Sequence, residues 1–288
     1  MSINELLMDF TKYLKGLKRS EATIVAYTKD LEQLADFVGA KDIKDINKKD
    51  LNNFVKDIIN KRKFSKKTAS RKINSFKTFF RYLEIKEILN ENPSTKISHP
   101  EIEENHPRVL AQVEYKAIRD TARKNIRNYT MIELMLQTGM KIGEVSRLKL
   151  EDVKLNSLPP KIFIREHESN PLRVIDLNEI AIEIIKKYLK YRQKRPNDKG
   201  YLFNTRSGKN ILIRNIRTAI NRICRRAGVK AVRVNDFRNT FIAHQIENGL
   251  KLDKIAEFVG HKRSASTEKY LAVTERKTPG DGTDIVPL

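Results

Sequence analysis

The amino-acid sequence predicts two domains: an all-α N-terminal domain and a mixed α/β, mainly helical C-terminal domain with a small antiparallel sheet. Residues 1–92 show helical periodicity only. Residues 93–107 contain prolines and mixed charge without periodicity, which indicates a linker. Residues 108–274 combine helical stripes with two short strand-like segments, and residues 275–288 form a tail. A length of 288 residues is sufficient for two domains.

Four helices are expected in the N-terminal domain. Residues 3–17 carry apolar side chains at helical spacing, and Ser20 and Gly39 suit the two ends of a second helix over residues 21–38. A third helix begins near Asn47 or Asp50, and a fourth follows Ser65. The apolar faces of these helices predict one shared core, which includes Leu6, Phe10, Leu14, Ile24, Leu31, Leu34, Leu51, Phe54, Ile73, Phe76, Phe79, Phe80 and Leu83.

The first half of the fourth helix is strongly basic. A helix N-terminus and cationic side chains both favour phosphate, so this surface is a candidate for DNA binding. A face of lysines that are simply solvated is the equally weighted alternative. The candidate residues, all expected to be exposed, are Lys66, Lys67, Arg71, Lys72 and Lys77.

The C-terminal domain is predicted to begin with helices within residues 109–122 and over residues 129–137, the second ending at Thr138-Gly139. A further helix begins at Lys141, and residues 150–153 lead into a strand. Two strands are then expected, 162–165 and 173–177, followed by a helix over residues 178–193. Arginines follow one another along a later helix and suit contacts with backbone phosphates. They are Arg214, Arg217, Arg222, Arg225 and Arg226.

Composition limits the possible functions. The net charge is +22 and the isoelectric point about 9.9, so the protein attracts polyanions, with nucleic acid ahead of an anionic membrane surface. A lysine-rich proteome is the alternative explanation of this charge. No apolar stretch is long enough to span a bilayer, and the N-terminus lacks the pattern of a signal peptide. We therefore expect a cytoplasmic protein with no membrane partner.

Metal and disulfide chemistry are not expected. Cys224 is the only cysteine, and the five histidines are scattered without the spacing of metal ligands. In the tail, glycines and prolines prevent a long helix after residue 270, so only the last residues, 285–288, are expected to dock on another surface. The sequence predicts no cofactor.

Three residues of the C-terminal region can act on one phosphate. Arg238 opens an apolar helix, His261 follows the end of a second helix, and Tyr270 lies nine residues further on. Arginine offers a fork of N–H donors to phosphate oxygens. Histidine can donate to an oxygen or move a proton near neutral pH, and a tyrosine hydroxyl can act as a covalent nucleophile.

This ordered set resembles the C-terminal signature of the tyrosine recombinase (phage integrase, Xer-like) family, H-x-x-R, then L-G-H, then Y nine residues on. A second family motif, T-G-[LM]-R-x-x-E-x-x-x-L-x-x-x-D, is matched at Thr138, Gly139, Met140, Glu144, Leu148 and Asp152. The four expected N-terminal helices look like the core-binding (SAM-like) domain of that family. The resemblance therefore covers both domains.

The resemblance implies site-specific DNA recombination through a 3′-phosphotyrosyl intermediate, without metal or nucleotide. Tyr270 is then the nucleophile, Arg238 a clamp on a phosphate oxygen and His261 a further donor. The implied partner is a double-stranded DNA recombination site. Family members act as tetramers on two sites and are usually monomers in free solution, and some work with a partner recombinase.

Three positions depart from the family pattern. The first catalytic arginine of the family falls on Lys141, and the histidine of H-x-x-R falls on Asn235, which can still donate a hydrogen bond. The lysine of the strand hairpin falls on Glu168, or alternatively on Ser169. Lysine keeps the charge of arginine but loses its fork. Lys141 is also a conceivable substitute for the missing proton donor.

Several functions remain open on the sequence alone. One is an active recombinase, working in integration, excision, resolution or inversion. A second is a DNA-binding relative that has lost cleavage and acts as an architectural or regulatory partner, and a third is a nicking enzyme like the type IB topoisomerases. Lys141 can be natural or engineered. The retained nucleophile favours the recombinase.

Overall fold

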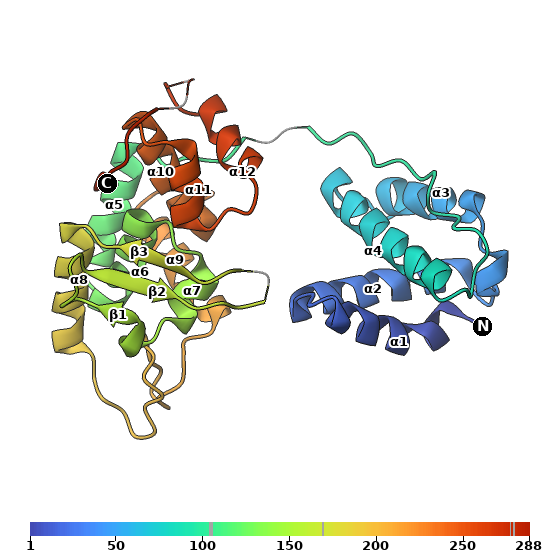
Figure 1. Cartoon of the computed structure of the whole chain (residues 1–288), viewed down its shortest axis with the longest axis horizontal. Coiled ribbons are helices and arrows are strands. Elements are labelled where there is room, and N and C mark those ends of the chain that lie inside the picture. Colours follow the sequence, from blue (N-terminus) through green and yellow to red (C-terminus); the bar gives the residue numbers. More distant parts are fainter. Residues whose placement is uncertain (104–105, 169, 277, 279) are drawn as a thin grey trace. The chain divides into compact units, whose positions relative to one another are not determined.

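The computed structural model describes residues 1–103, 106–168, 170–276, 278 and 280–288. The chain divides into two compact units, Met1–Glu104 and Asn105–Leu288, and each is described here by itself (Figure 1). The predicted fold class is confirmed. The first unit is helical, and the second packs helices around a small sheet.

The N-terminal unit contains α1 (Ile3–Gly16), α2 (Glu21–Val38), α3 (Lys48–Lys56) and α4 (Lys66–Ile85), with short turns of helix at Ile43–Asp45 and Asp57–Lys61. Local caps set where the helices begin. The hydroxyls of Ser20 and Ser65 accept hydrogen bonds from the backbone N–H three residues on, and Asn47 forms a capping box with Asp50. The core combines many Ile and Leu side chains with a group of aromatic ones, which includes Phe10, Phe54, Phe76, Phe79 and Phe80.

A buried ionic cluster joins α2 to α4. The Asp30 carboxylate, 3% exposed, accepts hydrogen bonds from Lys72 Nζ at 2.8 Å and from Arg71 Nη2 at 2.9 Å. Lys72 Nζ also donates to Gln33 Oε1 at 2.7 Å. The prediction that Lys72 is exposed is therefore wrong, because the side chain turns inward to pair with a carboxylate that would otherwise be buried uncompensated. Helical spacing alone placed it beside Arg71 on the basic surface.

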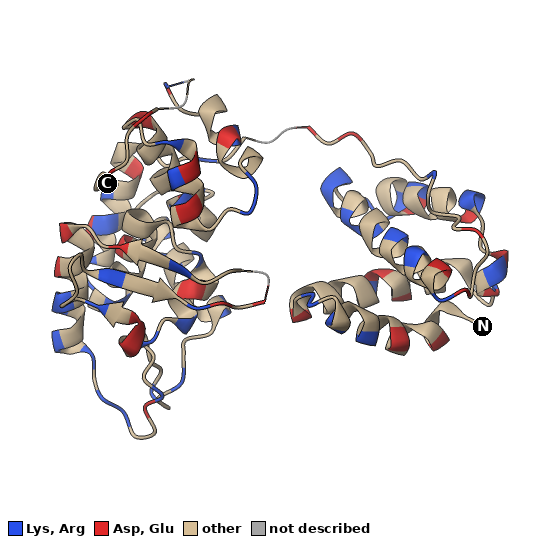
Figure 2. Ribbon diagram, in the orientation of Figure 1, with Lys and Arg blue, Asp and Glu red and all other residues tan. Residues whose placement is uncertain are grey.

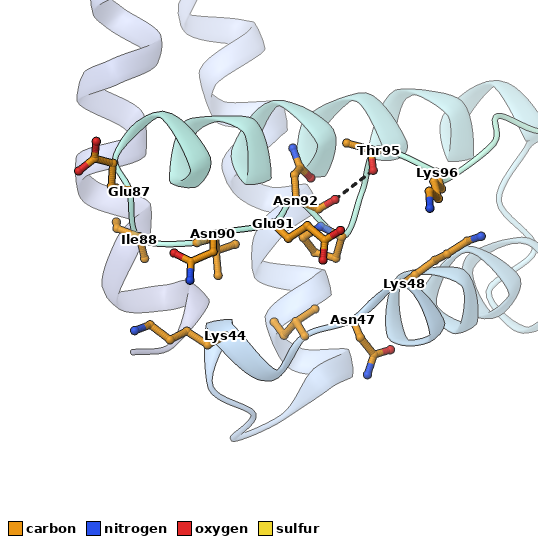
Figure 3. Close-up of a pocket in the computed structure, with 13 residues that line it drawn as sticks. Lys44, Asn47, Lys48, Glu87, Ile88, Asn90, Glu91, Asn92, Thr95 and Lys96 are labelled. Carbon is orange, nitrogen blue, oxygen red and sulfur yellow. Dashed lines mark hydrogen bonds between the residues drawn. The ribbon is translucent and has the colours of Figure 1, made fainter.

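The N-terminal unit also carries an open pocket of about 530 Å³. Figure 3 shows its wall, formed by the start of α3 and by the segment after α4, with Lys44, Lys48 and Lys96 interspersed with Glu87 and Glu91. Thr95 Oγ1 donates to the Asn92 carbonyl oxygen at 3.1 Å along this wall. None of the residues predicted to bind DNA or to act in catalysis lines this pocket.

The C-terminal unit is built around two helices that are buried on nearly all sides, α6 (Ile126–Thr138) and α10 (Val234–Glu247). Every residue from Thr130 to Thr138 is buried. The remaining helices of this unit are α5 (Gln112–Ala122), α7 (Ile142–Arg147), α8 (Glu179–Tyr191), α9 (Ile213–Arg226), α11 (Leu252–Val259) and α12 (Ala265–Glu268), with a 3-10 turn at Lys269–Ala272.

The sheet has three antiparallel strands in the order β1 (Val153–Lys154), β2 (Lys161–Ile164) and β3 (Arg173–Asp176). The two predicted strands are confirmed as β2 and β3, which pair with Ile162 opposite Ile175. The third strand, β1, follows Leu150-Glu151-Asp152, where the sequence also predicted a strand. Ile162, Ile164 and Ile175 are buried, so the sheet contributes one face to the core.

The tail docks on its own unit. Gly282 forms a parallel bridge with Leu250. Val286 exchanges two hydrogen bonds with the Gln245 side chain, at 2.7 and 2.9 Å. The Leu288 carbonyl oxygen accepts from Gln137 Nε2 at 2.9 Å and from Arg119 Nη2 at 2.8 Å. The expectation that residues 285–288 dock is confirmed, with α10, α6 and α5 as their partners. The expectation that only these tail residues dock is wrong, because Gly282 also pairs with Leu250. No helix among the described residues is long and apolar enough to cross a membrane.

The ionic cluster gives a stability prediction. Asp30→Asn in the full chain leaves the buried Lys72 ammonium without a counter-charge, which costs about 3–5 kcal/mol. We expect the backbone amides of α2 and α4 to lose their protection from hydrogen–deuterium exchange at a lower urea concentration in this variant than in the wild type. Exposed Asp9, paired with Lys12 at 2.9 Å, is the control, since Asp9→Asn should cost less than about 1 kcal/mol. The double variant Asp30→Asn, Lys72→Met should recover most of the lost stability. An Asp30→Asn variant as stable as the wild type would contradict this assignment.

Candidate active site

Arg238 lies at the centre of the candidate site. It is 4% exposed, in the second turn of α10. Its Nη1 donates to the Gly139 carbonyl oxygen at 2.6 Å and its Nη2 to the Val259 carbonyl oxygen at 2.7 Å. These carbonyls lie at the C-terminal ends of α6 and α11, where helix dipoles favour a cation. Burial lowers the pKa of Arg238 to about 10, so the guanidinium remains charged at neutral pH.

Gly139 is required at the end of α6. Its φ is +60°, in the left-handed region, and a Cβ there would lie 2.7 Å from the Phe241 ring. Only glycine therefore allows α6 to turn away while its last residues still face α10. The turn places Lys141 at the N-cap of α7, close to Arg238.

Lys141 is half-buried and reaches the turn between β2 and β3. Its Nζ donates to Asn170 Oδ1 at 2.5 Å. Its backbone N–H donates to Glu144 Oε2 at 2.8 Å. Burial is the main cause that lowers the pKa of Lys141, and the nearby cations Arg238, Arg173 and Lys262 add to it.

A buried ion pair holds this region together. Arg173 of β3 donates from Nη1 and Nη2 to the two oxygens of Glu144, at 2.8 and 2.7 Å. Its Nε donates to the Phe258 carbonyl oxygen at 2.9 Å, which links the sheet to α11. Hydrogen bonds from Arg173 hold the pKa of Glu144 below its ordinary value despite burial. From the sequence, Glu144 was a motif position and Arg173 the start of an expected strand, and their pairing was not predicted.

His261 follows Gly260, which ends α11 in the left-handed conformation. The His261 Nδ1 and the Thr267 hydroxyl lie 2.9 Å apart in a hydrogen bond. Burial first, and then the charges of Arg238, Lys269, Lys141 and Arg173, lower the pKa of His261 to about 4. The ring is therefore neutral at pH 7 and can either donate or accept a proton.

Tyr270 is withdrawn from solvent, at 3% exposure, in the turn after α12. Its hydroxyl donates to Asn239 Oδ1 at 2.7 Å. Asn235 Nδ2 donates to the same oxygen at 2.9 Å, and Asn239 Nδ2 donates to the Arg108 carbonyl oxygen at 3.1 Å. Burial raises the pKa of Tyr270. The sequence analysis missed Asn239, although an amide four residues after Asn235 on an apolar helix is a detectable signal.

The hairpin turn carries Glu168, which is exposed and has a φ of 52°. Its carboxylate lies 3.9 Å from His167 Nδ1. His167 and Asn170 exchange backbone hydrogen bonds of 3.0 and 2.9 Å across this turn. Ser169, the alternative position for the missing lysine, lies outside the described residues. The assignment of Glu168 to the lysine position stays a prediction.

The predicted DNA-binding residues lie on two helices. Lys66, Lys67 and Arg71 are exposed on α4, and Lys77 is partly exposed. Arg214 and Arg217 are exposed on α9. Figure 2 shows Lys and Arg gathered along α4 and distributed over the C-terminal unit. Among the described residues, no group of His, Cys, Asp and Glu side chains could hold a metal ion.

The site as a whole is cationic. Arg238, Lys141 and His261 are close enough to perturb one another electrostatically, and Arg238 acts on Tyr270 in the same way. Glu144 is the acidic residue beside them, and Arg173 neutralises it. Such a pocket suits a group that gains negative charge during reaction.

Comparisons with known proteins follow the same division of the chain. Residues 108–277 match the family described as "Phage integrase family". Residues 6–89 match the family described as "Phage integrase, N-terminal SAM-like domain". A "Tyrosine recombinase" of Pseudothermotoga lettingae is 28% identical over 284 residues, covering 96% of each chain. A "Tyrosine recombinase XerC" of Leptospira interrogans is 27% identical over 288 residues, covering 96% of this chain and 91% of the other.

Solved structures show the same fold. The XerH site-specific recombinase in a post-cleavage complex with its palindromic difH substrate has a TM-score of 0.76 at 20% identity, covering 88% of this chain and 77% of that chain. The Tn1549 transposon integrase in complex with circular intermediate DNA has a TM-score of 0.77 at 15% identity, covering 94% of this chain and 95% of that chain.

The low pKa of His261 is directly measurable. Because burial and neighbouring cations disfavour the imidazolium, we expect the ring resonances of His261 to keep their neutral shifts from pH 8 down to about pH 5 and to titrate near pH 4. The measurement is an NMR titration of the full chain, with His261→Gln used to assign the resonance. A midpoint between pH 6 and 7 would show that the ring is solvated and free of the cationic neighbours.

Proposed function

This chain belongs to the phage integrase family, and we propose that it is a site-specific tyrosine recombinase, which cleaves and rejoins DNA through a 3′-phosphotyrosyl intermediate. One observation carries the proposal. Arg238, Lys141, His261 and a tyrosine hydroxyl come from four separate segments and share one cationic pocket. A structural role alone does not require cations to be gathered around a tyrosine.

In the proposed reaction Tyr270 Oη attacks the scissile phosphorus and the 5′ oxygen of the next nucleotide leaves. The Tyr270–phosphorus bond replaces the bond that breaks, so the strand can be rejoined without a cofactor. The neutral ring of His261 can accept the tyrosine proton. Arg238 and Lys141 supply positive charge to the non-bridging oxygens, where negative charge increases in the transition state.

Tyr270 has to move before it can react. Its hydroxyl is buried and donates to Asn239, so a DNA phosphate cannot reach it in this arrangement. The tyrosine lies in a four-residue 3-10 turn, Lys269–Ala272, which follows the four-residue helix α12. We infer that DNA binding shifts this segment and releases the hydroxyl from Asn239.

Double-stranded DNA is the proposed partner. Exposed cations of α4 and α9, including Lys66, Lys67, Arg214 and Arg217, suit contacts with backbone phosphates. We propose a monomer in free solution and a tetramer on two DNA sites, in which a partner recombinase can supply the second type of subunit. We also propose a cytoplasmic location, which a DNA substrate supports. The retention of Tyr270, Arg238 and His261 in one pocket supports cleavage over a purely architectural role.

Covalent capture tests the proposed function. The substrate is a pool of DNA duplexes with random or genomic sequences, each with a nick in one strand. Cleavage beside the nick releases a short fragment that diffuses away, so the strand cannot be rejoined and the covalent intermediate accumulates. We expect a DNA–protein adduct on a denaturing gel, and sequencing of the trapped DNA yields the site. Tyr270→Phe should abolish the adduct, since it removes the nucleophilic oxygen.

Two further variants sharpen the result. Glu168→Lys restores the cation that the family resemblance places on the hairpin and should preserve or raise adduct formation. Tyr191→Phe, at an exposed tyrosine on α8, is the matched control and should leave the adduct unchanged. Selective DNA binding without an adduct in any variant would instead support the architectural alternative.

The burial of Lys72 predicts a difference between two lysines of α4. Lys67→Met should weaken binding to the selected site and lower the slope of log K against log salt concentration by about 0.9, as expected for one lost phosphate contact. Lys72→Met should leave that slope unchanged, because its ammonium is paired with Asp30. The measurement is fluorescence anisotropy over a range of salt concentrations. Equal slopes for both variants would contradict this distinction.

A further inference from the structure

The proposed reaction leaves one chemical role without an assigned residue. The 5′ oxygen departs as an alkoxide unless a proton reaches it, and a positioned acid accelerates such a step by about 10²–10⁴-fold. No lysine occurs in the turn between Arg165 and Arg173. Arg238 is a poor acid, because its guanidinium is fixed to two carbonyl oxygens and holds its proton even with a pKa lowered to about 10. His261 is neutral at pH 7 and is already the proposed acceptor of the tyrosine proton.

Lys141 is the cation whose ammonium reaches the hairpin turn. Its backbone lies at the N-cap of α7, yet its Nζ is 2.5 Å from Asn170 Oδ1 on the turn between β2 and β3. Asn170 is itself fixed by two backbone hydrogen bonds with His167. The Asn170 amide oxygen therefore accepts from one N–H of the ammonium, and the other N–H groups of Lys141 can donate to a different acceptor.

No carboxylate fixes the proton on Lys141. Among the described residues, Lys141 Nζ forms no ion pair, because Glu144 of α7 gives both of its oxygens to Arg173 of β3. The Glu144 charge opposes the lowering of the Lys141 pKa, but the cations Arg238 of α10, Arg173 of β3 and Lys262 after α11 act in the other direction. Burial and this surrounding positive charge lower the pKa of Lys141, which makes its proton easier to release than that of an exposed lysine.

Lysine can do one thing at this position that arginine cannot. An arginine side chain keeps its proton under all ordinary conditions, so it can only stabilise charge. A lysine with a lowered pKa can transfer a proton and take it back. The presence of lysine here, beside a hairpin that has none, accounts for two of the three departures from the family pattern with one residue.

We propose that Lys141 is the general acid of the cleavage step, and that Asn170 positions its ammonium. As Tyr270 Oη bonds to phosphorus and the bond from phosphorus to the 5′ oxygen breaks, a proton passes from Lys141 Nζ to that oxygen. His261 takes the proton of Tyr270 Oη, so the products are a phosphotyrosyl bond, a free 5′ hydroxyl, a neutral Lys141 amine and a protonated His261. In rejoining, the amine takes the proton back from the attacking hydroxyl. This inference rests on the proposed recombinase function.

The deciding experiment changes the leaving atom. The nicked duplex captured by the wild-type chain is prepared with oxygen or with sulfur at the bridging 5′ position of the scissile phosphate. A thiol has a pKa near 8.5, so a thiolate leaves without needing a proton. Single-turnover adduct formation is measured for the wild type, Lys141→Arg and Lys141→Met. His167→Gln is the control for a titratable side chain on the turn.

On the oxygen substrate we expect Lys141→Arg and Lys141→Met to be slower than wild type by about a hundredfold or more. On the sulfur substrate Lys141→Arg should come within about tenfold of wild type, because it keeps the charge and lacks only the transferable proton. The His167→Gln rates should stay close to wild type on both substrates. For the wild type, the rate on the oxygen substrate should fall as pH rises through the lowered pKa of Lys141, and the sulfur substrate should show no such fall.

Two results would overturn the proposal while leaving the recombinase function intact. One is a Lys141→Arg variant that cleaves the oxygen substrate faster than wild type, which would make Lys141 a weakened clamp. The other is an equal deficit on both substrates. A wild-type chain that forms no adduct on either substrate would overturn the recombinase function, and this inference with it. Asn170→Ala should reduce the rate on the oxygen substrate alone, whereas a purely structural role of Asn170 would reduce both.

Discussion

The C-terminal unit depends on the position of one buried guanidinium. Arg238 is surrounded by protein and contacts the last carbonyl oxygens of α6 and α11. Burying a charge is costly unless dipoles or counter-charges replace water, and two helix C-termini provide such dipoles. The same contacts fix where α6 and α11 end relative to α10. Fold stability and the charge of the pocket thus rest on the same hydrogen bonds.

The Glu144–Arg173 pair extends this arrangement to the sheet. Both partners are buried, and Arg173 also binds the Phe258 carbonyl oxygen on α11. A buried pair of this kind contributes little net stability, but it enforces one geometry, since separating the partners leaves an uncompensated charge. That geometry engages both Glu144 oxygens with the Arg173 guanidinium. The pocket remains cationic although a carboxylate lies within it.

The tyrosine is held in a state that cannot react. Asn239 accepts hydrogen bonds from Tyr270 and from Asn235, and it donates to the carbonyl oxygen of Arg108, near the start of the unit. These bonds satisfy a buried hydroxyl, which would otherwise be costly to leave without a partner. The buried hydroxyl is out of reach of a DNA phosphate in this arrangement, so we infer that the segment carrying Tyr270 moves before the reaction.

The sequence alone determined the fold class and most helices, and it supplied the residues that we propose to react. Helical periodicity and the caps at Ser20, Ser65 and Gly260 are local, and the spacing of Arg238, His261 and Tyr270 is carried by the chain itself. Only the tertiary structure decided which side chains pair. Lys72 turns inward to Asp30, Asn239 holds Tyr270, and Lys141 reaches Asn170. Partners of this kind lie on different elements or on a different face from the one that periodicity indicates. Their choice depends on the balance between desolvation and pairing, which exists only once the chain has folded.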